Sequence, residues 1–248
     1  MKKLLFILIL FSVAIAKAQT PAHSPAPKVI SSNERASNDT IIVKDPTDPS
    51  RVTITIKSTK GIVLSRGTMV KGKKDGIWRT YTDAGTLATI DEYKHGQHNG
   101  ASVTLSPIGQ ITQDVNYKND VLDGEKMTYL GTGKIKTVEN YSNGILHGEK
   151  KSYYEDSKLQ EESTYKNGLR NGVCIWYMET GKPSVEFNYI NGSLEGPAKE
   201  YNSNGFLQRE GIYKDNNEEG EWKEYSDSIL VKKIIYKGGT VVKEIPVK

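Results

Sequence analysis

The sequence predicts an all-β protein, an elongated antiparallel meander of tandem 24-residue β-hairpins, and three observations support this. Glycines recur at a constant 24-residue spacing, tyrosines keep the same register, and turn-forming dipeptides separate short strand-like stretches. Self-similarity at a fixed period is the signature of a repeat architecture. The array is predicted over residues 51–248 as about eight units, of which the first and the last are degenerate. The recurring glycines, called anchor glycines below, are Gly76, Gly100, Gly124, Gly148, Gly172, Gly196 and Gly220.

Two tyrosine positions repeat with the anchor glycines. Counted along the chain from each anchor glycine, they are positions +5 and +17, and together they hold 13 of the 14 tyrosines. Because hydrophobic residues make up only 36% of the chain, we expect these tyrosines to supply much of the packing between neighbouring units. The +5 tyrosines are Tyr81, Tyr129, Tyr153, Tyr177, Tyr201 and Tyr225, and the +17 tyrosines are Tyr93, Tyr117, Tyr141, Tyr165, Tyr189, Tyr213 and, in a last unit one residue shorter, Tyr236.

Each unit holds two turn signals, which divide it into two antiparallel strands. Asn143-Gly144 is a two-residue turn of the kind that needs positive φ at both positions, the strongest short-range signal for a β-hairpin. The stretch from Thr82 to Gly85 has the Asp and Gly chemistry of a longer hairpin loop. The anchor glycine lies inside a strand, where glycine marks a bend or a close backbone approach. Counting back through the preceding turn places Gly196 opposite Phe187, so we expect this glycine to make room for the ring.

The ends of such an array need protection, because an unpaired edge strand can recruit other chains. The stretch from Arg51 to Lys57 is predicted to open the array and that from Val241 to Ile245 to close it, with charges that discourage edge pairing. Sixteen strands at about 4.8 Å each would give a ribbon roughly 75 Å long.

Residues 1–50 read as an export signal and a linker. Lys2 and Lys3 precede an apolar run from Leu4 to Ala16, and Ala16-Lys17-Ala18 is a small-x-small cleavage pattern, so residues 1–18 are predicted to be a signal peptide. The mature chain would begin at Gln19 and be periplasmic, associated with the outer envelope or secreted, without a transmembrane anchor. Residues 19–50 are rich in Pro, Ser, Ala and Asn and are predicted to be a disordered linker.

Charge excludes one class of partner. Three of the 34 Lys and Arg residues lie in residues 1–18, which leaves 31 basic residues against 30 acidic ones in the mature chain. A nucleic-acid-binding protein needs a basic patch or stripe, and here the charges alternate in sign along the array. We therefore expect no nucleic acid as a partner.

The repeat unit resembles a known family. The pattern Tyr165-Lys166-Asn167-Gly168, then Gly172, Tyr177 and Gly181, resembles a MORN-type repeat, and more closely the bacterial variant known as YwqK-family antitoxin repeats. The resemblance covers residues 52–244. It implies an elongated β-hairpin scaffold that binds proteins or lipid headgroups. The antitoxin variant implies neutralisation of a toxin by binding it.

Candidate catalytic and metal-binding residues favour structural roles. Cys174 is the single cysteine, so the chain has no internal disulfide, and no histidine lies in its repeat or the adjoining ones to activate it. His95 and His98 have a metal-like spacing but flank a turn glycine, and His147 has no second ligand nearby in sequence.

Paired carboxylates do not make a site either. Glu161-Glu162 and Glu218-Glu219 are neighbours in sequence, and adjacent residues of a strand point to opposite faces. We predict no catalytic residue, no cofactor-binding residue, no metal ligand and no enzyme activity.

The three tryptophans are the remaining candidates. Trp78 and Trp222 lie at position +2 relative to an anchor glycine, and Trp176 lies at position +4. On an open sheet these rings could stack on sugars. The sequence thus favours an exported, non-enzymatic scaffold for an unidentified protein partner, with two alternatives: a glycan or lipid-headgroup binding module, and an antitoxin or immunity-type protein that binds a toxin.

Overall fold

A computed structural model describes residues 39–247, in which strands and the turns between them account for all regular structure. The predicted signal peptide and residues 19–38 of the predicted linker lie outside the described residues. The strands are β1 (Asp39–Lys44), β2 (Arg51–Lys57), β3 (Val63–Val70), β4 (Lys73–Tyr81), β5 (Leu87–Lys94), β6 (Gln97–Leu105), β7 (Ile111–Lys118), β8 (Val121–Tyr129), β9 (Ile135–Ser142), β10 (Ile145–Tyr153), β11 (Leu159–Lys166), β12 (Leu169–Arg170), β13 (Gly172–Tyr177), β14 (Pro183–Ile190), β15 (Ser193–Tyr201), β16 (Leu207–Lys214), β17 (Asn217–Ser226), β18 (Ile229–Lys237) and β19 (Thr240–Pro246).

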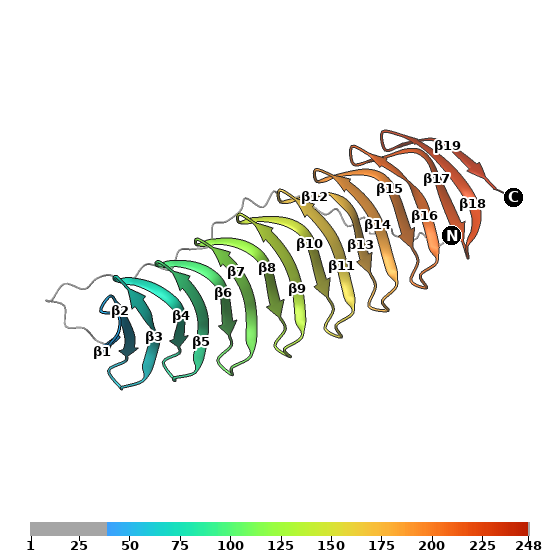
Figure 1. Ribbon diagram of the computed structural model, residues 1–248. Coiled ribbons are helices and arrows are strands. Elements are labelled where there is room, and N and C mark those ends of the chain that lie inside the picture. Colours follow the sequence, from blue (N-terminus) through green and yellow to red (C-terminus); the bar gives the residue numbers. More distant parts are fainter. Residues whose placement is uncertain (1–38, 248) are drawn as a thin grey trace. The chain divides into compact units, whose positions relative to one another are not determined.

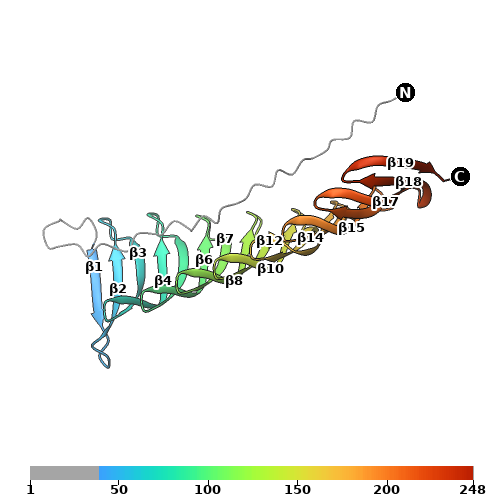
Figure 2. The same ribbon diagram turned by 90° about the horizontal axis from the view of Figure 1, so that it is seen from above.

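The strands form one antiparallel meander, which confirms the predicted fold class. Each strand pairs with the next one along the chain, and β12 and β13 both pair with β11 as two parts of one interrupted strand. The hairpins follow one another in a row from β1 to β19 (Figure 1). Seen from above, the strand direction rotates steadily between the two ends of the row (Figure 2), as the intrinsic twist of β-strands requires.

The turns have the predicted chemistry. Asn143 and Gly144 have φ values of 50° and 79°, and Ser142 pairs with Ile145 across them, so the loop has two residues with positive φ, as a type I′ turn requires. In the longer loop, the Gly85 amide donates to the Thr82 carbonyl at 2.8 Å.

Neighbouring hairpins are joined through their turns. The Gly144 amide donates to the Leu122 carbonyl of the preceding hairpin at 2.7 Å, and the Asn143 amide donates to the Asp123 carboxylate at 3.0 Å. Similar bonds recur, one repeat apart, at most of the other turns. A repeat whose edge donors are satisfied by the next repeat is stabilised mainly by its neighbours.

The anchor glycines bend the strands, as predicted. All seven have positive φ, from 70° at Gly220 to 124° at Gly100. The strand register shifts around them, for example between Leu146 and Lys150 in β10, so the extra residues form a bulge that turns the strand.

One predicted detail at an anchor glycine is wrong. Gly196 does not lie opposite Phe187, because the bulge shifts the register and places Ala198 there instead. The neighbour that limits space at Gly196 is Asn188, whose Nδ2 would lie 3.0 Å from an added Cβ.

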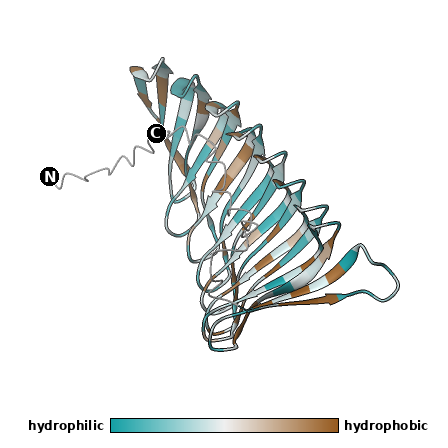
Figure 3. Ribbon diagram, turned by 90° about the vertical axis from the view of Figure 1, so that its left-hand side faces the viewer, coloured by the Kyte–Doolittle hydropathy of each residue, from teal (hydrophilic) through white to brown (hydrophobic). Residues whose placement is uncertain are grey.

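The bend creates an inside and an outside. Lys74 precedes Gly76 and Trp78 follows it, yet the Lys74 ammonium lies 4.7 Å from the centre of the Trp78 ring and 4.4 Å from that of Tyr93. The strand therefore folds toward the face that carries these rings, which we call the inner face; the opposite one is the outer face. Figure 3 shows the curved profile of the strands and the hydrophobic residues along them.

The N-terminal edge differs from the prediction. Residues 39–50 were expected to belong to the linker, but Asp39–Lys44 forms β1 and pairs with β2, so Arg51–Lys57 is not the edge strand. The β-branched run Thr40-Ile41-Ile42-Val43 favours a strand, and the repeat period does not extend to it. At the other end β19, which contains the predicted closing strand, is the edge.

We expect the array to scatter X-rays as an extended particle. A compact domain of about 200 residues has a radius of gyration near 16–17 Å, whereas a row of strands about 4.8 Å apart reaches roughly 85 Å here and should exceed 20 Å. Small-angle scattering measures this directly, and the compact value would contradict the open meander.

Candidate interaction surface

A single row of side chains runs along the inner face and holds most of the buried residues. Its members come from position +2 and from the residue paired with it on each neighbouring strand, and we call it the inner row. Along the chain it consists of Gly67, Trp78, Asp91, Ser102, Val115, Lys126, Glu139, Lys150, Ser163, Cys174, Phe187, Ala198, Gly211, Trp222 and Ile234.

Large members of the inner row lie beside small ones. Trp78 covers Gly67 and Trp222 covers Gly211, so closely that a Cβ on either glycine would overlap the indole ring. Trp78 is 5% exposed and Trp222 is fully buried. Each indole N–H donates to a backbone carbonyl, at 2.8 Å and 3.1 Å respectively.

The prediction that these rings could stack on sugars is therefore wrong for Trp78 and Trp222, because they pack into the sheet's own bend. Trp176 is half-buried, and the Arg170 guanidinium carbon lies 5.2 Å from the centre of its ring.

The middle of the inner face is charged, and its charges alternate. Lys126 and Lys150 lie 3.8 Å and 4.0 Å from the two carboxylate oxygens of Glu139, and Lys150 lies 3.9 Å from Glu161. Arg170 closes the chain at 2.7 Å from Glu161. The Glu161 pKa lies below its ordinary value: burial alone would raise it, but the bonds from Ser163 and Arg170 lower it. These residues are paired internally.

A second charged cluster lies near the C-terminal end of the inner face. Arg209 contacts Glu218 and lies 3.6 Å from Glu200 and 4.0 Å from Glu224, and its guanidinium carbon lies 4.3 Å from the centre of the Trp222 ring. Burial raises the Glu200 pKa above its ordinary value, although Arg209 opposes this shift. One arginine thus holds three carboxylates together.

The +17 tyrosines pack on the inner face, as predicted. Tyr213 makes edge-to-face contacts with Phe187 and Trp222, with ring centres 5.7 Å and 5.1 Å apart, a favoured geometry for aromatic pairs. Burial raises the Tyr213 pKa to about 12. At the other end His98 lies between Tyr93 and Tyr117 in the same way.

The candidate nucleophile and metal ligands are not brought together. Cys174 is fully buried and burial raises the pKa of its thiol, which disfavours the reactive thiolate. The His95 side chain is 75% exposed, whereas His98 packs between tyrosines, and His147 is exposed in another hairpin. Within residues 39–247, no three His, Cys, Asp or Glu side chains gather as a metal-binding group.

The paired glutamates separate, as predicted. Glu161 contacts Arg170 on the inner face, while Glu162 lies 3.0 Å from Lys151. Glu218 contacts Arg209, while Glu219 accepts a bond from the Gly238 amide.

The outer face carries a second continuous row, which the sequence reading missed. Each member pairs directly with the next across neighbouring strands, and we call this the outer row. Along the chain it consists of Arg66, Arg79, Ile90, Val103, Asp114, Met127, Val138, Lys151, Glu162, Ile175, Glu186, Lys199, Glu210, Lys223 and Lys233.

In the C-terminal half of the outer row, the charged residues form ion pairs with one another. Glu186 lies 3.9 Å from Lys199 and accepts a bond from Tyr201 at 2.7 Å. Glu210 repeats this arrangement with Lys223 at 3.4 Å and Tyr225 at 2.7 Å. The +5 tyrosines Tyr201 and Tyr225 thus lie on the outer face, and their hydroxyl groups donate to carboxylates of the outer row.

The two-residue turns form a third surface, the turn rim. Exposed aliphatic side chains follow three successive turns: Val121, Ile145 and Leu169 are 42%, 45% and 49% exposed. Each lies against the glycine of the next turn. Exposed Lys118 and Lys166 flank the same turns. No helix in the described part of the chain is long and apolar enough to cross a membrane.

Comparison with known families finds the repeat at three places. A family model described as a MORN repeat variant matches residues 74–95, 146–167 and 194–215. Each match begins two residues before an anchor glycine, so all three keep the 24-residue register. No curated protein matches the chain. The three matched units are therefore similar to a MORN repeat variant, and they stay in register along one antiparallel meander.

Proposed function

We propose that this chain is a non-enzymatic scaffold that binds a protein partner outside the cytoplasm. The observation that carries the proposal is the outer row, which presents one residue per strand in an unbroken line from Arg66 to Lys233. The inner face packs on itself through buried tryptophans and internal ion pairs. The N-terminal half of the outer row, from Arg66 to Val138, forms no ion pair within the described residues and is therefore the part free to meet a partner.

The outer row has the character of a protein-binding surface. Its apolar members form two directly opposed pairs, Ile90 with Val103 and Met127 with Val138, on either side of Asp114, and half-buried tyrosines lie beside them. Tyrosine offers a large apolar area with a polar tip and is enriched in protein interfaces. The YwqK-type resemblance is a narrower form of this proposal, in which the partner is a toxin.

Affinity capture tests the scaffold. The mature chain, residues 19–248, serves as bait against a cell-envelope extract, and captured proteins are identified by mass spectrometry. A matched bait carries Met127→Lys and Val138→Lys, which change the outer row and leave the inner row intact. We expect specific partners to be retained by the parent and lost from the variant. Identical retention by both baits would show that the apolar middle of the outer row does not bind the partner.

Export is tested separately. We expect the protein recovered from outside the cytoplasm to begin at Gln19, because the apolar run of residues 4–16 is too short to span a bilayer, which takes about 20 residues. N-terminal sequencing gives the answer, and a chain that retains Met1 in a membrane fraction would contradict the signal peptide.

Binding to lipid headgroups is a second candidate, and the turn rim is the observation that favours it. Exposed aliphatic residues flanked by lysines suit the surface of an anionic bilayer, where each nearby lysine contributes about 1 kcal/mol. Co-sedimentation with phosphatidylglycerol vesicles tests this idea. Ile145→Ser with Lys166→Gln should weaken it, whereas Met127→Lys should not.

A further inference from the structure

The first two members of the outer row are opposed cations without a carboxylate partner, whereas the last two, Lys223 and Lys233, pair with Glu210 and Glu221. Arg66 and Arg79 lie directly opposite each other on β3 and β4, and both are exposed. Their other partners in register are Thr55 and Ile90. Among residues 39–247 neither guanidinium forms an ion pair. Like charges directly opposite on a sheet are destabilising, so we expect the Arg66–Arg79 pair to lower the stability of the fold.

In a later unit, the position equivalent to Arg66 holds a carboxylate, Glu186, whose charge is balanced by a lysine. Tyr201 lies 15 residues after Glu186 and bonds to its carboxylate, which also faces Lys199. Tyr81 lies at the same distance after Arg66 and two residues after Arg79, as Tyr201 does after Lys199. The first unit therefore keeps the tyrosine and the cation but replaces the carboxylate with a second cation.

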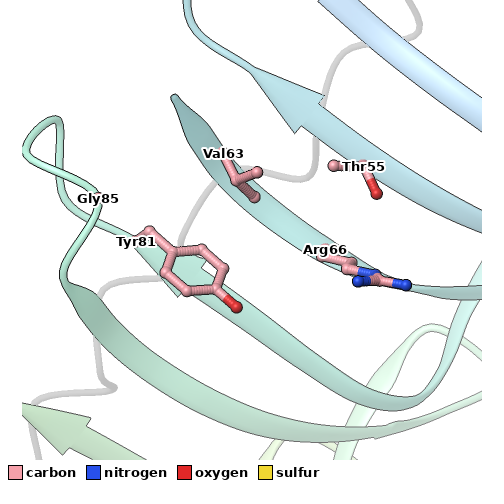
Figure 4. A pocket seen from close by; sticks show the side chains of 5 residues that line it. All are labelled: Thr55, Val63, Arg66, Tyr81 and Gly85. Carbon is pink, nitrogen blue, oxygen red and sulfur yellow. The ribbon is translucent and has the colours of Figure 1, made fainter. Parts of the chain in front are cut away.

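A hollow lies beside these groups. It has a volume of about 360 Å³ and is lined by Thr55, Val63, Arg66, Tyr81 and Gly85. Figure 4 shows Arg66 and Tyr81 over neighbouring strands, with the tyrosine hydroxyl group on the side of the guanidinium. The hollow thus offers a guanidinium and two hydroxyl groups as donors, next to the apolar side chain of Val63. A guanidinium fork matches the geometry of a carboxylate.

We infer that this end of the outer face binds an acidic segment of a protein partner. The carboxylate of an Asp or Glu side chain would lie between Arg66 and Arg79 and accept a hydrogen bond from Tyr81, with an apolar neighbour against Val63. The inference rests on the proposed scaffold function and adds where the partner binds and by what chemistry. A carboxylate is chosen because carboxylates fill the matching positions at Glu186 and Glu210.

A defined peptide tests the chemistry with purified protein. The probe is a fluorescein-labelled hexaglutamate, its binding to the full mature chain measured by fluorescence anisotropy at low and at physiological salt. We expect Arg66→Gln and Arg79→Gln each to weaken binding by at least about tenfold, because each removes a charged hydrogen-bonding partner. Lys136→Gln, which removes one exposed cation from β9, is the matched control and should leave binding unchanged.

Arg66→Glu provides a second readout that needs no ligand. It gives the first unit the arrangement of charges found around Glu186 and Glu210, with a carboxylate opposite Arg79 and within reach of Tyr81. We expect the variant to lose peptide binding and yet to melt at a higher temperature than the parent.

Three outcomes would overturn the inference: no saturable peptide binding, equal binding by parent and Arg66→Glu, or binding only to phosphatidylglycerol vesicles. Affinity capture with Arg66→Glu as bait separates the two proposals. Partners retained equally by this variant would overturn the acidic-segment site and leave the scaffold standing, whereas failure of the parent to capture a partner counts against the scaffold itself.

Discussion

Gly211→Ala is expected to destabilise the array by about 3 kcal/mol or more, an unusually large effect for the addition of one methyl group. Gly211 has no positive φ, so the backbone itself would accept alanine. The obstacle is the Trp222 ring, which lies over the glycine where the new Cβ would be. Either the ring leaves its site or the two strands move apart. Overpacking costs about 1–3 kcal/mol, and loss of a buried aromatic ring costs about 3–5 kcal/mol.

Two comparisons isolate this cause. Gly131→Ala is the matched control, because Gly131 also lacks positive φ and nothing lies within 4 Å of its added Cβ. Urea unfolding should show little change for that variant. In a Trp222→Ala background the cost of Gly211→Ala should largely disappear, since coupled neighbours are not additive. Equal effects of the two glycine changes would mean that the ring does not depend on the glycine.

The sequence predicts the hairpins well because their determinants are local. Asn-Gly dipeptides adopt positive φ for reasons within two residues, and the constant period predicts where the turns of each regular unit lie. Where the seventh unit loses a residue, Asp227 and Ser228 take φ values of 48° and 68°. The longer loop is thus replaced by a second two-residue turn.

The side-chain rows could not be predicted as well, because they depend on register across strands. The bulge at each anchor glycine shifts the pairing, so a count along flat strands misplaces Phe187 against Gly196. The same shift and the bend put Trp222 inside the sheet rather than on an open face. The sequence analysis did not predict β1, because this strand lies outside the 24-residue repeat.

A signal for the inner row was nevertheless present in the sequence. Trp78 and Trp222 are the two tryptophans at position +2, and Gly67 and Gly211 each precede their tryptophan by the same interval. A glycine at a fixed distance before each tryptophan predicts that one fits over the other. Next to Trp78 the inner row becomes polar: Asp91 lies opposite Trp78 and accepts a hydrogen bond from the Ser102 hydroxyl group.

Arg209→Met is expected to destabilise the protein at neutral pH by roughly 2–3 kcal/mol. The change removes the one cation among Glu200, Glu218 and Glu224 while keeping most of the side chain's volume. Breaking a buried ion pair costs about 3–5 kcal/mol. We expect a smaller loss of stability for Arg209→Met than for a fully buried pair, because the side chains of the cluster remain about 19–32% exposed.

The pH dependence identifies the mechanism. Burial already raises the Glu200 pKa above 4.5, and Arg209 is the largest influence that lowers it, so its removal raises the folded-state pKa further. A group whose pKa is higher in the folded state binds its proton more tightly there, so stability is gained as pH falls and lost as pH rises through that pKa. The deficit of Arg209→Met should therefore be largest near pH 7 and shrink toward pH 4.5.

Urea unfolding between pH 4.5 and pH 7 measures this deficit. The control is Lys158→Met, which breaks an exposed ion pair and is expected to change stability little. Adding Glu200→Gln should recover part of the loss at pH 7, whereas a deficit independent of pH would mean that Arg209 acts through its packing on Trp222 alone.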